Sequence, residues 1–178
     1  MAKVLIATVK PFSAEAVEEV KGVFKDVGYD VEVLSKYPEQ SDLVTAVADV
    51  DALIIRSDKV DREVIEAAKN LKIVVRAGAG YDNVDLVAAT EKGVVVMNTP
   101  GQNSNAVAEL ALGMMVFMNR SGFTPAAGTE LRGKKLGIHA YGAVGRIVGM
   151  IAKGFGMKVY AYDPFVNPEV IKMMVWYV

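Results

Sequence analysis

The stretch GIHAYGAVGRI, residues 137–147, joins a short β-prone run to a helical pattern through a glycine turn. Its glycines follow the order of a phosphate-binding turn, except that Ala140 stands at the first glycine position. In such a turn the first glycine permits the tight bend, the second lets a pyrophosphate approach the backbone, and the third lets the helix pack closely on the strand. The stretch predicts a strand–turn–helix unit, in which an alanine at 140 is tolerated if the local φ is negative.

The acid that accompanies such a turn follows at a suitable distance. Asp163 ends the β-prone run MKVYAYD (157–163), 18 residues after Gly145. A carboxylate at this place accepts hydrogen bonds from a ribose diol and repels a 2′-phosphate, which favours NAD over NADP. The turn and the acid together predict a dinucleotide site. A glycine-rich turn that binds no ligand remains the alternative.

Upstream of this unit, β-branched runs alternate with helical patterns. Apolar strands separated by helices indicate a parallel sheet covered on both faces. The first expected helix has Ser13 as its N-cap and an apolar face made by Val17, Val20, Val23, Phe24 and Val27. The expected strands are 4–9, 29–35, 51–57, 71–77 and 94–100, and the expected helices are 13–28, 40–50, 61–70 and 85–93.

A composition shift near Asn98 predicts a domain boundary, with one domain over 1–98 and a second over 99–178. The second begins with a polar segment and a long apolar helix, 106–118. A connector containing glycine and proline (124–135) then leads into the strand–turn–helix–strand unit that ends at Asp163.

The composition narrows the classes of function. The 178 residues carry 20 basic and 21 acidic side chains, and a net charge of −1 lacks the basic footprint of a nucleic-acid-binding protein. No apolar run approaches the ~18 residues needed to cross a bilayer, and no block of like charge suggests a membrane surface. The absence of cysteine excludes disulfides, thiolate catalysis and thiolate metal sites. A cytoplasmic protein without a metal site is predicted.

Several segments resemble one enzyme family. They are RAGAGYDNVDLVAATEKGVVVMNTPGQNSNAVAELALG (76–113), GTELRGKKLGIHAYGAVGRI (128–147) and GFGMKVYAYDP (154–164), supported by 54–80. The chain is similar to the N-terminal portion of the D-2-hydroxyacid dehydrogenases, most closely their phosphoglycerate dehydrogenase branch. The resemblance implies an α/β fold, in which a flavodoxin-like parallel-sheet substrate domain precedes the first βαβ part of a Rossmann-type NAD-binding domain.

The resemblance also implies which residues form the site. Arg56 and Ser57 are expected at the anionic end of the substrate, and Arg76 near its carboxylate. Helix 106–118 corresponds to a helix of the family's dimer core, so a homodimer is expected. The other residues expected at the substrate are Gly78, Ala79, Gly80 and Asn103. Those expected at NAD are Ala79 and Val107 on the nicotinamide side, Tyr141, Gly142, Ala143, Val144 and Gly145 around the pyrophosphate, and Asp163 at the adenosine ribose.

Physical chemistry independently supports the two arginines. Arg56 and Arg76 end predicted strands, and open α/β sheets bind ligands beyond the carboxyl ends of their strands. A guanidinium group also binds carboxylate or phosphate through two parallel hydrogen bonds. The alternative for each arginine is an ion pair with a neighbouring acid, such as Asp58 or Asp82.

No catalytic residue is assigned within these 178 residues. In the family, an arginine, a carboxylate and a histidine or lysine come from later strands and loops, which are expected beyond Val178. The only histidine, His139, lies on the strand that enters the turn, where its ring is expected to pack beside the sheet. The closing run MMVWYV (173–178) departs from the polar segment expected of the family. A short edge strand is one explanation, but a truncated gene or an altered reading frame is favoured, because an exposed apolar β-prone terminus promotes aggregation.

The sequence therefore predicts an incomplete NAD-dependent dehydrogenase that acts on a phosphorylated 2-hydroxy acid and is inactive alone. The alternative is a non-catalytic α/β module that binds a nucleotide, or a partner through helix 106–118. A receiver-like signalling domain ranks lower, because the first strand leads into Thr8, Lys10 and Pro11 rather than into clustered acids.

Overall fold

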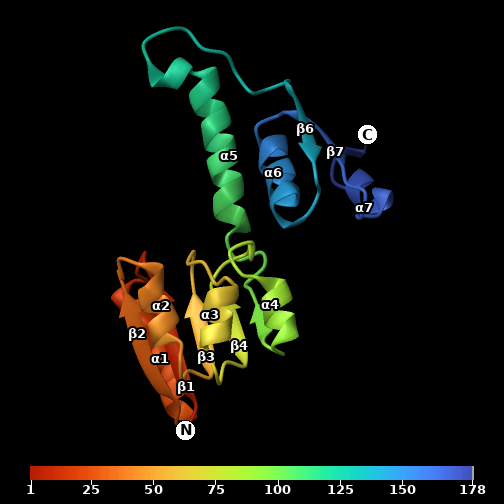
Figure 1. The fold of residues 1–178 in the computed structure, drawn as a ribbon. Coiled ribbons are helices and arrows are strands. Elements are labelled where there is room, and N and C mark those ends of the chain that lie inside the picture. The colour runs from red at the N-terminus through yellow and green to blue at the C-terminus, as the bar shows by residue number, and fades with distance from the viewer. Residues whose placement is uncertain (178) are drawn as a thin grey trace. The chain divides into compact units, whose positions relative to one another are not determined.

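The computed structural model describes residues 1–177, and of residue 177 only the backbone. The chain forms two compact units, Met1–Pro100 and Gly101–Val178 (Figure 1). The point of division lies two residues from the boundary that the composition predicts. That each unit is an independently folding domain stays a prediction.

The first unit is an open sheet in the order β2-β1-β3-β4-β5, in which all neighbouring strands are parallel. This order is that of flavodoxin-like folds, so the predicted fold class is confirmed. The strands are β1 (Lys3–Thr8), β2 (Asp30–Ser35), β3 (Ala52–Ile55), β4 (Ile73–Arg76) and β5 (Val95–Met97). The helices are α1 (Ala14–Asp26), α2 (Gln40–Ala46), α3 (Arg62–Ala67) and α4 (Leu86–Glu91).

Side-chain caps start three of these helices. Ser13 Oγ accepts a hydrogen bond from the Ala16 amide at 3.2 Å, which confirms the N-cap expected from the sequence. Asp61 and Asp85 cap α3 and α4 in the same way. Each cap satisfies one of the amides that a helix N-terminus leaves without an intrahelical acceptor.

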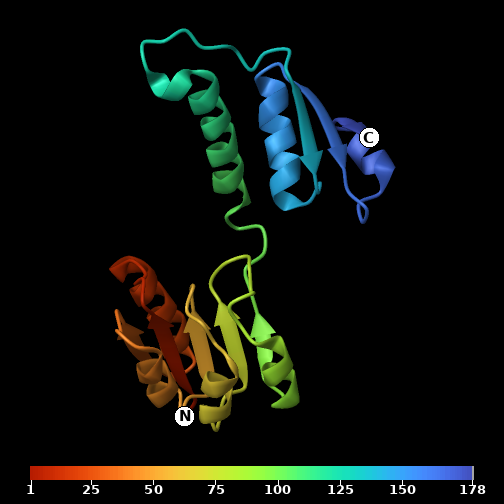
Figure 2. The same cartoon turned by 45° about the horizontal axis from the view of Figure 1, so that its top comes forward.

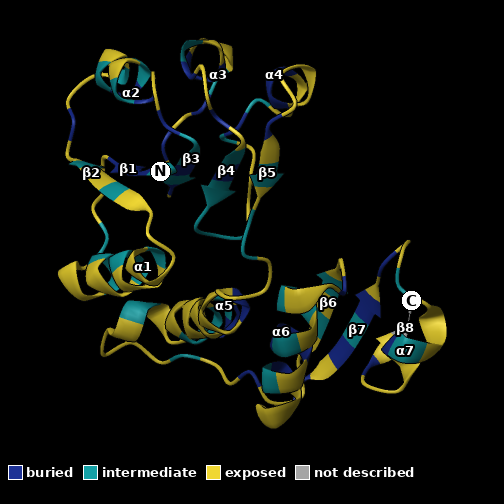
Figure 3. Cartoon of the chain, turned by 90° about the horizontal axis from the view of Figure 1, so that it is seen from below, coloured by how far each residue is buried: buried dark blue, intermediate teal, exposed yellow. Residues whose placement is uncertain are grey.

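The core of this unit lies on one face of the sheet, beneath α2, α3 and α4, whereas α1 lies on the other face (Figure 3). Helix α1 buries no residue completely, and Val23 and Val27 are 67% and 61% exposed. Val95 and Met97 of β5 are also exposed, because alternation along the strand turns them away from the core that Val96 contacts. The second face is covered at β1, where Val4 and Ile6 are 1% exposed, and open at β5, so the expectation of a sheet covered on both faces holds only in part.

The second unit contains a three-stranded parallel sheet in the order β6-β7-β8. Figure 2 shows α6 lying along the β6–β7 pair. The elements are α5 (Ser104–Asn119), the short 3₁₀ helix η1 (Ser121–Phe123), β6 (Lys135–His139), α6 (Ala143–Gly154), β7 (Lys158–Tyr162), α7 (Pro168–Lys172) and β8 (Trp176–Tyr177). The sequence predicted only the first βαβ part of such a domain, and the structure adds α7 and a third strand.

The run MMVWYV supplies that third strand. Trp176 pairs with Tyr160 and Tyr177 with Ala161, both in parallel register. Val175 is buried against the core that α6 covers. The short edge strand, the less favoured explanation of this run from the sequence, is present over Trp176–Tyr177, and residue 178 lies outside the described chain.

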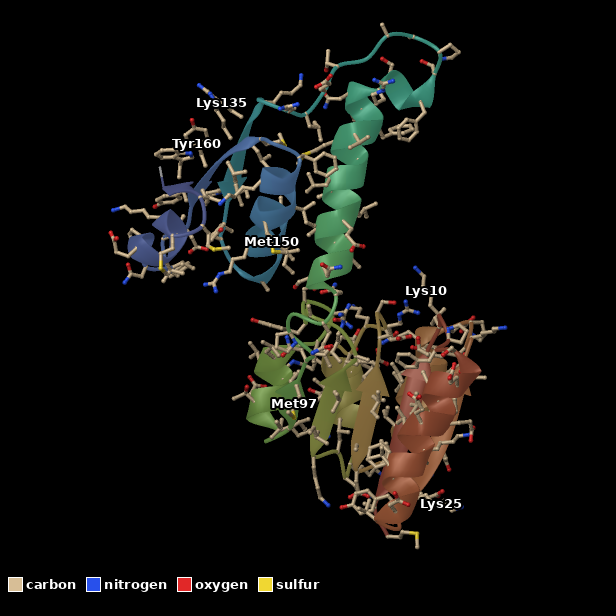
Figure 4. The ribbon with its side chains drawn as sticks, turned by 180° about the vertical axis from the view of Figure 1, so that it is seen from behind. Lys10, Lys25, Met97, Lys135, Met150 and Tyr160 are labelled. Atoms are coloured by element: carbon tan, nitrogen blue, oxygen red, sulfur yellow. The ribbon has the colours of Figure 1, made fainter. Side chains whose placement is uncertain are left out.

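One face of the second sheet is open. Lys135, Gly137 and His139 of β6 and Tyr160 and Tyr162 of β7 line a hollow of about 610 Å³, and Figure 4 shows Lys135 and Tyr160 on neighbouring strands of this face. The His139 ring stacks on the Tyr162 ring, with centroids 5.8 Å apart and planes inclined by 12°. The single histidine thus packs beside the sheet, as its position in the strand predicts.

None of the helices within residues 1–177 combines the length and the hydropathy that a membrane span requires.

Candidate functional site

The glycine turn of the second unit leaves β6 through Ala140. The Ala140 amide donates to the Tyr162 carbonyl at 2.8 Å, which extends the β6–β7 pairing by one residue. Ala140 then adopts φ +88°, in the left-handed region where a Cβ atom is crowded by the backbone. The condition under which alanine is tolerated here without strain, a negative φ, is not met. The first glycine position of the turn requires a positive φ, and this chain fills it with a strained alanine.

Gly145 explains why the turn holds this shape. A Cβ atom at Gly145 would overlap the carbonyl oxygen of Ala140 and lie 3.2 Å from Ile138 Cγ2. The carbonyl of the strained residue therefore occupies the space that the missing side chain leaves. Close packing of α6 on β6 depends on this glycine, as expected for the third glycine of the turn.

Ala140→Gly is expected to stabilise the protein by about 1 kcal/mol, because glycine adopts a positive φ without the Cβ penalty. The gain is reduced by the extra freedom that glycine gives the unfolded chain. Urea denaturation measures the change. Ala143→Gly, inside the first turn of α6, is the control and should destabilise. A loss of stability in Ala140→Gly would contradict the strain at this position.

Helix α6 begins directly after the turn with an uncapped N-terminus. Gly142 is its N-cap, makes no side-chain capping bond, and has no atom within 4 Å of the place where a Cβ would stand. Ala143, Val144 and Gly145 occupy the first helical turn, where amides have no intrahelical acceptor. An uncapped helix N-terminus with open space before it attracts an anionic group such as a phosphate.

Asp163 is buried, and its carboxylate connects the turn to the segment after β7. Oδ2 accepts from the Tyr141 amide at 2.7 Å, and Oδ1 accepts from the amides of Phe165 and Val166 at 2.8 and 3.1 Å. The Phe165 bond contributes most to holding the pKa of Asp163 below its usual value, with the other two amides and Arg146 acting in the same direction against desolvation. A carboxylate has about four lone-pair sites, so one remains for a ribose hydroxyl.

Tyr141 has a place in the turn that differs from the expected one. Its amide is already bound to Asp163, and its side chain is only 1% exposed, inside the core between β6 and α6. Burial raises the pKa of its hydroxyl group, which has no hydrogen-bond partner among the described residues. The expectation that Tyr141 itself faces a pyrophosphate is corrected: it supports the turn, and the open amides begin after it.

In the first unit, the two arginines lie at the carboxyl ends of adjacent strands. Arg76 ends β4 opposite Ile55, and Arg56 follows Ile55 directly. Neither guanidinium forms an ion pair within residues 1–177, so the alternative of a pair with Asp58 or Asp82 is wrong. Both are therefore available to an anion at this edge of the sheet, beside the exposed Ser57.

The glycine-rich loop 77–80 is held at the same edge. The Gly78 carbonyl accepts from the Thr99 amide at 2.9 Å, and the Ala79 carbonyl accepts from Asn98 Nδ2 at 2.7 Å. The amides of Ala79 and Gly80 donate to no acceptor in the described chain. Beside them, Arg76 Nε is buried and without a partner there. Carbonyls turned into the fold and amides left free make this loop suited to an anion.

Asn98 was not predicted from the sequence as part of this arrangement. Its position could have indicated it, because Asn98 directly follows β5, at the edge of the sheet that carries the carboxyl ends of the strands. The remaining predicted residues, Asn103 and Val107, lie at the start of α5 in the second unit. Asn103 is its N-cap without a capping bond, and Val107 is 40% exposed.

The chain is similar to proteins of one dehydrogenase family. Residues 4–175 match the family model of the D-isomer specific 2-hydroxyacid dehydrogenase catalytic domain. A hydroxypyruvate reductase of Thermotoga maritima is 43% identical over 154 residues, covering 79% of this chain and 50% of its own length. A D-3-phosphoglycerate dehydrogenase of Methanocaldococcus jannaschii is 38% identical over 190 residues, covering 98% of this chain and 34% of its own length.

A solved structure agrees with these relatives. The NAD⁺-bound 3-phosphoglycerate dehydrogenase of Entamoeba histolytica superposes with a TM-score of 0.88 at 47% identity, over 93% of this chain and 55% of its own. The chain thus spans about half, or less, of the length of these proteins. The match extends through α7 to residue 175 and includes the first three residues of the closing run. On these grounds, the chain belongs to the D-isomer specific 2-hydroxyacid dehydrogenase family.

Proposed function

We propose that this chain contributes the substrate domain and the first part of the cofactor domain of an NAD-dependent 3-phosphoglycerate dehydrogenase, acting in serine synthesis. The observation that carries the proposal is the glycine turn joined to Asp163, in a chain of this family. The relatives that are named D-3-phosphoglycerate dehydrogenase support the choice of substrate.

The residues present fit a dinucleotide. The first-turn amides of Ala143, Val144 and Gly145 would receive the pyrophosphate across the open space at Gly142, and the remaining lone pair of Asp163 would receive a ribose hydroxyl. The negative charge of Asp163 would repel a 2′-phosphate, which favours NAD. When bound, NAD supplies a nicotinamide C4 that accepts hydride.

The first unit would hold a phosphorylated 2-hydroxy acid. The amides of Ala79 and Gly80, with Arg76, would bind the carboxylate, while Arg56 and Ser57 would bind the phosphate end. The Arg76 guanidinium lies over Gly78, in the space that a side chain at position 78 would occupy. By the family resemblance, Val107 of the second unit would lie toward the nicotinamide.

The 178-residue protein is expected to bind NAD at least about fivefold more tightly than NADP, because one unfavourable charge contact costs on the order of 1 kcal/mol or more. Isothermal titration calorimetry measures both affinities. Addition of 3-phosphoglycerate should shift the ¹H–¹⁵N NMR signals of Arg56, Arg76, Ala79 and Gly80. We also propose that these residues alone produce no NADH, since His139 is stacked in the open sheet face and no other acid/base is assigned.

Two results would contradict separate parts of this proposal, the inactivity of the chain alone and its substrate. Clear NADH production from 3-phosphoglycerate and NAD by the pure chain would refute its expected inactivity. NAD binding without any response of the first unit to 3-phosphoglycerate would favour the alternative, a non-catalytic nucleotide-binding module. The predicted cytoplasmic location stays a prediction.

A homodimer through α5 is the second part of the proposal. One face of α5 packs in the core through Ser104, Ala108 and Leu112. Its other face exposes an apolar stripe at helical spacing, made by Val107 (40% exposed), Leu110 (64%), Met114 (59%) and Phe117 (46%). A continuous exposed apolar stripe of this kind is typical of a protein interface, and a second copy of the chain is the partner that the family resemblance implies.

Met114→Glu is expected to convert the dimer to a monomer at micromolar concentration, because it places a charge within the stripe. Sedimentation velocity measures the mass. Met150→Glu, on the 56% exposed Met150 of α6, is the matched control and should leave the dimer intact. A dimer that persists in Met114→Glu would place the interface elsewhere.

A further inference from the structure

Asp58 is a buried carboxylate that the proposed function leaves unused. It is 6% exposed, and both of its oxygens accept hydrogen bonds. Oδ1 accepts from the Val9 amide and from the Tyr37 hydroxyl, each at 2.7 Å, and Oδ2 accepts from the Arg56 amide at 3.3 Å. Three donors around one carboxylate compensate for its removal from water.

These donors come from three different strand ends. Val9 follows β1, Tyr37 follows β2 and Arg56 follows β3, so Asp58 joins the carboxyl ends of three neighbouring strands. The backbone before Tyr37 turns through Lys36 at φ +56°, a strained conformation for lysine. This strained turn precedes the tyrosine whose hydroxyl donates to Asp58. Burial, and then this bond, raise the pKa of Tyr37, so the hydroxyl remains a donor.

The same residue also connects to the segment after the glycine-rich loop. The Asp58 carbonyl accepts from Asn83 Nδ2 at 2.7 Å, and the Val60 amide donates to the Asn83 carbonyl at 2.8 Å. Val60 and Val84 form a parallel bridge beside this contact. The Arg56 segment and the segment that follows Gly80 are therefore held to each other through Asp58 and Asn83.

This arrangement leaves the positive charge of the Arg56 side chain without an acidic partner in the described chain. Asp58 is the nearest acid in sequence and would neutralise the guanidinium if its carboxylate turned outward. Instead the carboxylate is directed into the fold and binds the backbone amide of Arg56, while the Arg56 side chain is exposed. The fold thus removes a competing anion and fixes the backbone that carries the arginine.

We propose that Asp58 is a positioning residue, which holds the Arg56 backbone and keeps its guanidinium free for the phosphate end of an anionic substrate. This inference rests on the proposed function in one respect, the identity of the anion. The hydrogen bonds on which it depends are present without ligand, so the two are tested separately.

The ligand-free test is hydrogen exchange by NMR. Asp58→Asn keeps the size of the side chain but places an amide group where one oxygen stood, so it cannot accept all three bonds. Exchange of the Arg56 and Val9 amides should accelerate about tenfold or more. Asp26→Asn removes an exposed acid at the end of α1 and should change neither amide. Unchanged exchange in Asp58→Asn overturns the positioning role, whether or not the protein binds 3-phosphoglycerate.

The ligand test separates positioning from a general loss of structure. Asp58→Asn should weaken 3-phosphoglycerate binding about tenfold, the effect of losing one charge-assisted hydrogen bond. In an Arg56→Gln background the same substitution should cause almost no further loss, because Asp58 acts through Arg56. Equal losses in both backgrounds would show a merely structural role and overturn the proposal. If wild type binds no 3-phosphoglycerate, the proposed function fails, and the exchange data alone decide the role of Asp58.

A second variant covers the case in which Asp58→Asn does not fold. Tyr37→Phe keeps the carboxylate and removes one of its three donors. It should accelerate exchange at Arg56 and Val9 in the same direction but by less, about twofold to fivefold. If neither variant altered these amides, Asp58 would have no positioning role.

Discussion

Gly145→Ala is expected to destabilise the protein by about 3 kcal/mol and to abolish measurable NAD binding. The added methyl group would overlap the Ala140 carbonyl, so either α6 must move away from β6 or the turn must change its shape. Overpacking of this kind typically costs about 1–3 kcal/mol, and here the obstacle is backbone rather than a flexible side chain. Urea denaturation and calorimetry with NAD measure the two effects.

Gly154→Ala is the matched control in the same helix. No atom lies within 4 Å of the place where its Cβ would stand, so the substitution should be neutral or should stabilise by up to about 1 kcal/mol. If Gly145→Ala kept the stability and the NAD affinity of the wild type, close approach of α6 to β6 at the turn would not be required. The proposal for the cofactor site would then lose its geometric basis.

Asp163→Asn is expected to weaken NAD binding on the order of tenfold or more, through two losses. The amide side chain is a poorer acceptor for the ribose, and it cannot accept all three backbone bonds that the carboxylate receives. Exchange of the Tyr141 amide should accelerate in the protein without ligand. Glu130→Gln, an exposed acid of the connector, is the control. Weaker NAD binding with unchanged Tyr141 exchange would restrict Asp163 to the ribose.

The lowered pKa of Asp163 predicts how the effect of Asp163→Asn on stability depends on pH. A carboxyl group whose folded-state pKa is below its ordinary value of 3.8 stabilises the folded protein fully above that value. The stabilisation is lost as pH falls through the lower folded-state pKa. The difference in stability between wild type and Asp163→Asn should therefore be constant from neutral pH to about pH 5 and shrink below about pH 4. A difference independent of pH down to pH 2 would contradict this role of the charge.

Asp163 is therefore expected to have two roles, one toward the ribose and one in the turn. The sequence connects this acid to a ribose through its distance from the glycine turn. The structure adds that the same carboxylate holds the turn, through the Tyr141 amide. Loss of the charge should then disturb the place of the pyrophosphate as well as that of the ribose. The strained Ala140 next to Tyr141 makes this restraint more important than it would be beside a glycine.

The sequence alone was sufficient for features that depend on near neighbours in the chain. The alternation of apolar runs with helical patterns predicted the parallel α/β fold, because each run specifies its own element and parallel strands need crossovers. Ser13 predicted a helix start, since a cap acts on an amide three residues away. The order of Gly142, Gly145 and Asp163 predicted the turn and its acid for the same reason: short spacings within one βαβ unit leave few alternatives.

Tertiary structure decided what depends on distant partners. The sequence left the φ of Ala140 open, and its conformation is set by the pairing with Tyr162 and by the space at Gly145. Asp58 was a candidate partner for the Arg56 side chain, yet Val9 and Tyr37, distant in sequence, turn its carboxylate inward. Spacing along the chain determines which groups can meet at one strand end. Which hydrogen bond a buried carboxylate makes is settled only when the strands are assembled, because every donor within reach then competes for the same few lone pairs.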